Sequence, residues 1–233
     1  MNMLNWLFTA TSLSVLLVTV ERYSFTTKIL LQPYNFIRLH EVVQMCLIIL
    51  ITVLIPILIL RELTKNFELL KSPKFFWLVG AFIVGVYFYA TGNGVHEVSS
   101  FYFNNFCEVD NIQDDLCGSF FINDYYLGNI LYFFGAILMT VPLMVIEYLK
   151  PVFSFTKKQI LITFANSLFF ALAIFAYSGF DRVLVGLYYS VIITLIALGM
   201  LFLKKDFLKR PYTFYVASSY TIGTLLALIF RLR

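Results

Sequence analysis

Seven apolar segments, each about twenty residues long, occupy most of this 233-residue chain. A bilayer with a hydrocarbon core about 30 Å thick requires about 20 apolar residues in each helix that crosses it. Charged residues make up 13% of the chain, whereas a soluble domain carries roughly 25%. The ~10-residue alternating strands of a membrane barrel are absent from the sequence. The sequence therefore predicts one all-α polytopic membrane domain over residues 1–233.

Short polar segments separate the expected helices. Residues 95–103 would extend the third helix if the chain stays helical through Gly92 and Gly94. The segment 21–39 is predicted as either a loop or a re-entrant segment. The expected helices cover residues 3–20, 40–60, 75–91, 126–148, 159–178, 183–203 and 212–230.

The distribution of Lys and Arg predicts the orientation of the chain. The loops 61–74, 148–158 and 204–210 hold eleven of the 17 basic residues and fall on one side of a seven-helix topology, which leaves six for the opposite side. Basic loops favour the cytoplasmic side of a membrane. The N-terminus is therefore expected in the cytoplasm, and the C-terminus outside an inner or plasma membrane.

The segment 92–125 contains no Lys or Arg and is expected to form an acidic extracytoplasmic loop between the third and fourth helices. Cys107 and Cys117 lie in it with nine residues between them. Because the outer compartment permits disulfides, we expect a bridge worth roughly 2–3 kcal/mol; free or metal-binding thiols are the alternative. The acids of the segment are Glu97, Glu108, Asp110, Asp114, Asp115 and Asp124.

The two histidines of the chain are each followed by a glutamate, as His40-Glu41 and His96-Glu97. The second helix begins and the third helix ends on the outer side, so both pairs are expected at one membrane face. Imidazole and carboxylate groups form a ligand set for zinc, iron or manganese. One hypothesis from the sequence is therefore a divalent metal held by these four residues. A metal-free polar pocket and plain interfacial residues are the two alternatives.

Further polar residues are expected to line an outward-opening pocket around the histidines. Gln44 and Ser100 follow the histidines by four residues, which places each on the same helical face as its histidine. Helix ends at a membrane surface also tolerate such residues because water reaches them. The expected pocket-lining residues are Gln44, Asn93, Ser100, Asn129, Asp181 and Tyr188.

Several functional classes are excluded or disfavoured by residues that the sequence lacks. The architecture is similar to that of the membrane hydrolases that include alkaline ceramidases and adiponectin-type receptors, but segment 212–230 has no His for their zinc site. The same segment has no Lys to form a retinal Schiff base. The helix interiors hold no deep Asp, Lys or Arg, which disfavours proton-coupled transport. Glu147 is expected to reach the interface or to pair there.

The leading functional hypothesis is a pocket that handles a lipid or another amphiphile, with metal-assisted hydrolysis as the proposed chemistry. The histidines would hold the ion, and Glu41 or Glu97 would ligate it or act as general base. The alternatives are a non-enzymatic binding or assembly protein that uses the acidic loop, and a small-solute transporter. Membrane lipid is the expected surrounding and no nucleic-acid partner is expected, because the basic residues are spread between apolar runs.

Overall fold

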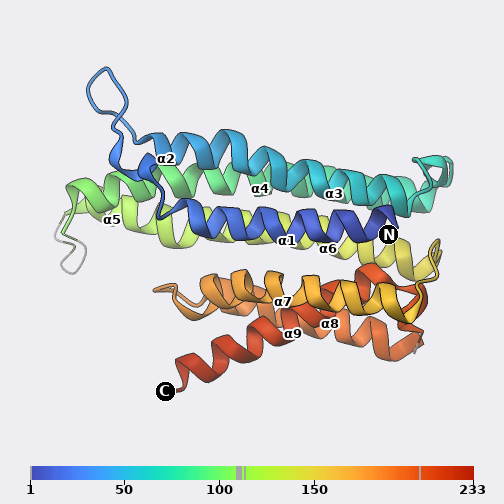
Figure 1. Ribbon diagram of the computed structural model, residues 1–233. Coiled ribbons are helices and arrows are strands. Elements are labelled where there is room, and N and C mark those ends of the chain that lie inside the picture. Colours follow the sequence, from blue (N-terminus) through green and yellow to red (C-terminus); the bar gives the residue numbers. More distant parts are fainter. Residues whose placement is uncertain (1, 109–111, 113, 205) are drawn as a thin grey trace.

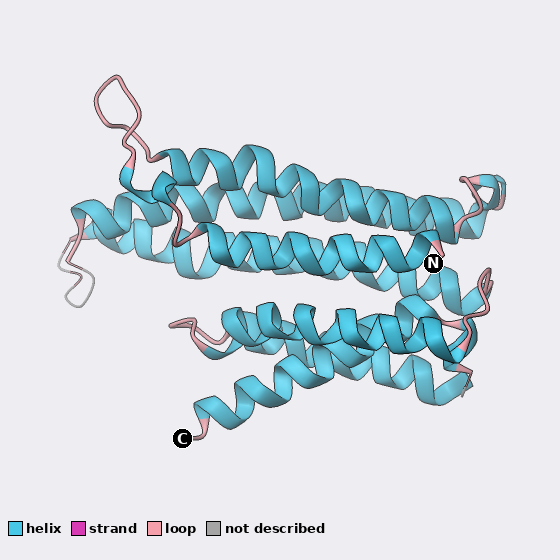
Figure 2. Cartoon of the chain, in the orientation of Figure 1, coloured by secondary structure: helices cyan, strands magenta, loops and turns pink. Residues whose placement is uncertain are grey.

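The computed structural model describes residues 2–108, 112, 114–204 and 206–233. These residues form helices and connecting loops without a β-strand, and the long helices lie side by side (Figures 1 and 2). The α-helices are α1 (Met3–Glu21), α2 (Leu39–Val42), α3 (Ile49–Leu63), α4 (Pro73–Phe106), α5 (Asp115–Ile122), α6 (Asn129–Leu149), α7 (Lys157–Gly179), α8 (Val185–Lys204) and α9 (Pro211–Arg231).

Short 3₁₀ turns and π-helical segments connect these α-helices. The 3₁₀ turns are η1 (Phe25–Lys28), η3 (Glu68–Lys71) and η5 (Phe207–Lys209), and the π-helical segments are η2 (Val43–Ile48) and η4 (Asn123–Gly128). Segment η2 links α2 to α3 without a break, and η4 links α5 to α6. Each of these composite helices is one candidate span.

Seven helical segments of the described chain are long and apolar enough to cross a bilayer, which confirms the predicted all-helical membrane architecture. They are Met3–Lys28, Leu39–Leu63, Pro73–Phe106, Asp115–Leu149, Lys157–Gly179, Val185–Lys204 and Pro211–Arg231.

The two ends of the bundle differ in charge. One end, which we call the basic end, carries the N-terminus and the loops 64–72, 150–156 and 204–210 (Figure 1). The opposite end, which we call the acidic end, carries the C-terminus and the segments 22–38, 107–114 and 180–184 (Figure 1). The termini therefore lie at opposite ends, as an odd number of spans requires.

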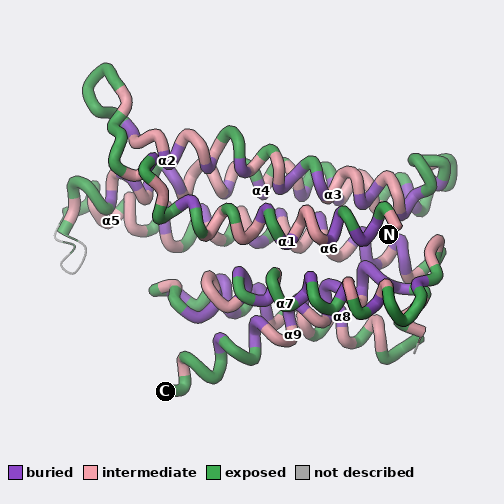
Figure 3. Tube along the Cα trace, viewed as in Figure 1, coloured by how far each residue is buried: buried purple, intermediate pink, exposed green. Residues whose placement is uncertain are grey.

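Many large apolar side chains are exposed, while polar side chains are buried beside the apolar core; Figure 3 shows how buried and exposed positions alternate along the helices. Trp77 is 75% exposed, whereas Thr163 is fully buried. Helices α1 and α7 meet along a polar seam, in which Thr163 Oγ1 donates to Asn5 Oδ1 at 2.9 Å and Asn166 Nδ2 donates to Thr9 Oγ1 at 3.0 Å. Such hydrogen bonds hold helices together in lipid, where apolar burial alone offers little driving force.

Helices α4 and α6 approach each other closely through glycines. A Cβ atom at Gly92 would stand 2.2 Å from the Tyr132 nitrogen, and one at Gly135 would stand 2.2 Å from the Tyr89 nitrogen. Only glycine allows this separation between the two backbones. The contact continues to Gly128, which lies against the backbone of His96. The close approach therefore fixes the position of His96 relative to α6.

The expectation of a loop over 92–125 is wrong in its bounds. Helix α4 continues through Gly92 and Gly94 to Phe106, and α5 resumes the helix at Asp115. Glycine weakens an isolated helix, but here the packing of Gly92 on α6 outweighs that preference. The connection is confined to residues 107–114, and Asp110 lies outside the described residues.

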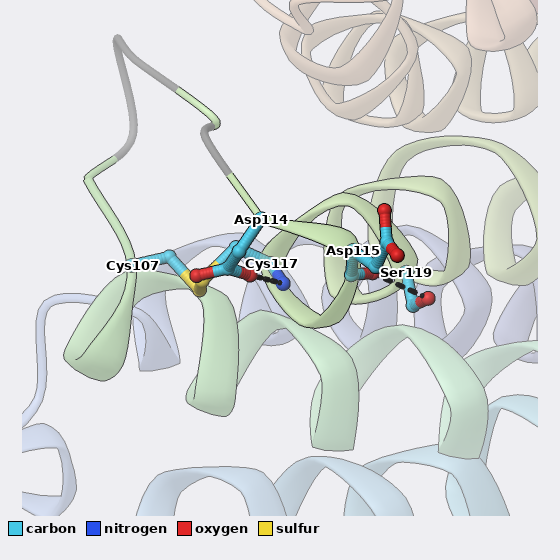
Figure 4. The surroundings of a disulfide bond; sticks show 5 residues. All are labelled: Cys107, Asp114, Asp115, Cys117 and Ser119. Atoms are coloured by element: carbon cyan, nitrogen blue, oxygen red, sulfur yellow. Dashed lines mark hydrogen bonds between the residues drawn. A yellow bond between two sulfur atoms is a disulfide. The ribbon is translucent and has the colours of Figure 1, made fainter.

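The predicted disulfide is present between Cys107 and Cys117, with Cα atoms 5.7 Å apart (Figure 4). It joins the end of α4 to the first turn of α5. Asp114 Oδ1 accepts a hydrogen bond from the Cys117 backbone nitrogen at 2.6 Å and so caps α5 (Figure 4). Bridge and cap together fix the short connection at the acidic end.

The segment 21–39 is a loop and makes no second pass through the bundle. After η1 the chain projects beyond the acidic end and returns to α2, and an isolated bridge between Leu30 and Arg38 closes the projection (Figure 1). Tyr34 at its tip is 94% exposed.

Candidate functional site

A single elongated chamber of about 800 Å³ opens among the helices and is lined by residues from all seven candidate spans. Its lining along η4 and α6 extends from Asp124 to Leu143. Nineteen residues at about 1.5 Å per residue give a depth of about 28 Å, close to the thickness of a bilayer core. The chamber is polar toward the acidic end and apolar and aromatic toward the basic end.

At the polar end, His40 lies between two carboxylates. Its Nδ1 atom is 2.5 Å from Glu21 Oε2, and its Nε2 atom is 3.9 Å from Glu97 Oε2. Glu21 is also held by Gln44, whose Nε2 atom donates to Oε2 at 2.9 Å, and by the hydroxyl of Thr26. Glu21 therefore orients the ring, and Nε2 faces Glu97, which lines the chamber with His40.

The second histidine is oriented by a different acid. His96 Nδ1 lies 2.8 Å from Asp124 Oδ1 and 3.2 Å from the Asp124 carbonyl oxygen. Asp124 belongs to the π-helical segment η4, and His40 lies in α2, which leads into the π-helical segment η2. A π turn inserts one extra residue and changes the direction of the side chains around it, and such turns are frequent at functional sites.

The four predicted metal ligands do not converge as expected. Glu41 forms an ion pair with Arg38 instead, and His96 pairs with Asp124. Among the described residues, no three His, Cys, Asp or Glu side chains are grouped so that they could hold one ion. Adjacent residues of a helix point about 100° apart, which explains why each glutamate faces away from its neighbouring histidine.

Four of the six predicted pocket-lining residues do line the chamber, namely Asn93, Ser100, Asn129 and Asp181. Gln44 is buried behind it and holds Glu21. Tyr188 is 63% exposed and lies outside the chamber lining, so that assignment is wrong. The next residue, Tyr189, is rotated about 100° around α8 and lines the chamber in its place.

Arginines and one further acid surround the polar end of the chamber. Arg22 and Arg182 both line it, and the Arg182 guanidinium lies 5.9 Å from the centre of the Tyr125 ring. Asp181, in the turn between α7 and α8, accepts a hydrogen bond from Asn129 Nδ2 at 3.4 Å. Burial raises the pKa of Asp181.

Tyrosines dominate the deeper chamber, a feature that the sequence analysis missed. Tyr89 and Tyr132 stack at 4.3 Å and their hydroxyls lie 2.9 Å apart. The Tyr189 and Tyr220 hydroxyls lie 2.5 Å apart, and Tyr215 bonds Ser12 at 2.8 Å. Tyr89, Tyr189, Tyr215 and Tyr220 are buried between the helices.

The sequence analysis also missed Glu21, and it counted Asp124 only as a loop acid. One signal for Glu21 is that it is the first charged residue of the printed sequence, at the same end as His40. Comparison of the chain with protein-family models, with curated proteins and with solved structures finds no match.

Proposed function

We propose that this protein binds a single-chain membrane amphiphile in the chamber. The polar head lies at the acidic end, and the chain extends among the apolar and tyrosine side chains toward the basic end. The observation that carries the proposal is the shape and polarity of the chamber. It is about 28 Å deep, as calculated from the rise per residue of the helix that lines it, and it is polar at one end. Its volume of about 800 Å³ lies within the ordinary range of small-molecule sites.

The charges at the polar end favour a zwitterionic head group. Arg22 and Arg182 present guanidinium groups, which suit phosphate, and Asp181 and Glu97 present carboxylates, which suit an ammonium group. The apolar lining below them suits the chain, through side chains such as Ile59. Positive and negative side chains at the same chamber mouth suit a head group that carries both a negative and a positive charge.

The same proposal includes an orientation in the membrane. With eleven basic residues in the segments 61–74, 148–158 and 204–210, the positive-inside rule favours a cytoplasmic position for the basic end. The chamber mouth then faces outward from an inner or plasma membrane, in a compartment where the disulfide persists. Reporter domains fused to the C-terminus should be active only outside. Activity only in the cytoplasm would reverse the orientation.

The binding proposal is tested by filling the chamber. Ala136 lines the chamber on α6, whereas Ala90 is exposed on the outside of α4. We expect Ala136→Trp to lose the amphiphile that co-purifies with the wild type, measured by native mass spectrometry. Ala90→Trp is the control and should retain it. Equal retention by both variants would contradict the proposal.

Metal-assisted hydrolysis of the bound amphiphile is the second candidate, and one observation favours it. Metal-ligating histidines usually donate their other ring nitrogen to a carboxylate, which orients the ring. His40 has this arrangement, with Glu21 at Nδ1 and Glu97 facing Nε2 at 3.9 Å. In this scheme His40 and Glu97 would hold zinc, iron or manganese together with further ligands from the substrate or water, and the ion would activate water.

The metal content of the purified protein tests this second candidate. Near one equivalent of zinc, iron or manganese is expected in the wild type, lost in His40→Ala. His96→Ala tests whether the second histidine contributes, since it pairs with Asp124. A folded wild-type sample that has not met chelator and contains none of these metals would contradict metal-assisted hydrolysis and leave amphiphile binding unaffected.

A further inference from the structure

Two buried polar groups that line the chamber have neither a hydrogen bond nor an ion pair in the described structure. They are the side-chain amide nitrogen of Asn93 and the hydroxyl of Tyr177. Tyr220 is close enough to Tyr177 to influence its hydroxyl, but the two hydroxyls do not meet hydrogen-bond geometry. An unpaired buried donor is costly, so both groups point to an acceptor that belongs in the chamber.

The two unpaired groups lie at the same level of the bundle. Gly92, the neighbour of Asn93, lies against the backbone of Tyr132. Tyr177 packs its ring on Phe133, the next residue of α6, with centroids 5.1 Å apart. Helices α4 and α7 therefore contribute one donor each to the chamber beside residues 132–133.

This level lies just below the charged mouth. Asn93 precedes Glu97 by four residues on α4, which places it about 6 Å deeper along the helix. Its amide nitrogen can only donate, and a hydroxyl donates readily. A carbonyl oxygen has two lone pairs and can accept from both groups at once. An acyl amphiphile carries such a carbonyl between its head and its chain.

We infer that the ligand is an acyl amphiphile whose ester or amide carbonyl accepts hydrogen bonds from Asn93 and Tyr177. This inference rests on the proposed amphiphile binding and adds the chemical class of the linkage. The zwitterionic head then lies at the mouth beside Arg22, and the chain continues past Ile59 toward the basic end. The two donors distinguish an acyl-linked molecule from an ether-linked one of equal length.

Two probes that differ only at this linkage test the inference. Palmitoyl lysophosphatidylcholine carries an ester carbonyl, and its hexadecyl ether analogue carries none. Because a ligand without the acceptor leaves both donors unpaired, the wild type should bind the ester about 10- to 100-fold more tightly. Dissociation constants are measured for both probes by native mass spectrometry of the full chain.

Variants of the two donors should abolish that preference. In Asn93→Leu and Tyr177→Phe together we expect the ester-to-ether ratio to approach one, with each single variant between. Both substitutions remove groups that have no hydrogen-bond partner among the described residues, so thermal stability should be unchanged or higher. Asn105→Leu and Tyr188→Phe are the controls, because neither residue lines the chamber, and they should keep the wild-type ratio.

The possible outcomes separate this inference from the binding proposal. A wild type that binds both probes equally would overturn the acyl assignment while amphiphile binding stands. Retention of the ester preference in the double variant would also overturn the acyl assignment, since residues other than Asn93 and Tyr177 would then bind the carbonyl. Failure of both probes to bind would contradict the amphiphile proposal and the acyl inference with it.

Discussion

Two buried glutamates, one toward each end of the bundle, have opposite surroundings. Glu147 on α6 accepts hydrogen bonds from the backbone nitrogens of Tyr212 and Thr213 at 2.9 and 2.8 Å, and from the Thr213 hydroxyl at 2.7 Å. Glu97 on α4 has His40 Nε2 at 3.9 Å and lines the chamber. Both residues are buried, since Glu147 is 1% and Glu97 5% exposed.

The difference separates an acid that accepts hydrogen bonds from a helix start from an acid that faces the chamber. Helix α9 begins at Pro211 without a side-chain cap from its own segment, and Glu147 supplies the acceptor that its first N–H groups require. Of the two expectations for Glu147, reaching the interface or pairing there, the structure shows pairing, with the start of α9. Glu97 has no comparable set of donors in the described structure. A carboxylate buried at a chamber wall with so few partners is suited to a ligand.

The largest expected effect is the loss of stability in Glu147→Leu. The substitution leaves three buried donors of Tyr212 and Thr213 unpaired, at about 1 kcal/mol or more for each. We expect the free energy of unfolding to fall by about 3 kcal/mol or more, measured by denaturant unfolding in detergent. Glu68→Leu, an exposed acid near the same end, is the control and should stay within about 0.5 kcal/mol of the wild type.

The next largest effect is expected at the glycine contact that positions α4. In Gly92→Ala the added methyl meets the Tyr132 backbone at 2.2 Å, and such overpacking costs about 1–3 kcal/mol. Gly94→Ala meets nothing within 4 Å and replaces a poor helix former, so it should be neutral or stabilising. Equal unfolding free energies for the two variants would show that the close approach does not position Glu97 and His96.

Glu97→Gln and Glu147→Gln compare the two acids directly. We expect Glu97→Gln to change the free energy of unfolding by less than about 0.5 kcal/mol and to weaken binding of palmitoyl lysophosphatidylcholine about tenfold or more, as lost pairing of a charged group does. Glu147→Gln should lose stability and keep the dissociation constant. An equal loss of stability in Glu97→Gln and Glu147→Gln would contradict the proposed difference between the two acids.

The smallest expected effect concerns Asp181, which has an intermediate environment with one weak side-chain partner. Its raised pKa means that the folded protein holds this proton more tightly than the unfolded chain. The contribution of Asp181 to the free energy of unfolding is therefore greatest below the ordinary Asp pKa of about 3.9. It decreases as pH rises through the raised pKa of the folded protein. Asp181→Asn should be more stable than the wild type at neutral pH, with the difference vanishing toward pH 3. Melting temperatures across pH measure this, and a constant difference would contradict it.

The sequence predicted the parts of this molecule that depend on local composition. Apolar run length identified seven spans, cysteine spacing identified the bridge between Cys107 and Cys117, and helical spacing placed Asn93 and Ser100 on the chamber wall. These features follow from the bilayer and from helix geometry. They need no knowledge of which helices touch.

The parts that the sequence did not predict depend on contacts between distant segments. The pairing of His40 with Glu21, and of His96 with Asp124, arises where separate helices meet at the π-helical segments. The position of Tyr189, rather than Tyr188, at the chamber is a matter of helix rotation, which packing decides. No local pattern in the chain encodes these choices.

Photo-crosslinking most directly tests the claim that the chamber holds the chain of an amphiphile. Lysophosphatidylcholine with a photoreactive group near the chain terminus is irradiated with the purified protein, and the labelled residues are mapped by mass spectrometry. We expect labels on deep chamber residues such as Met139, Leu143 and Val216, lost in Ala136→Trp and kept in Ala90→Trp. Labels confined to lipid-facing residues such as Ile83 and Leu195, unaffected by either variant, would contradict the claim.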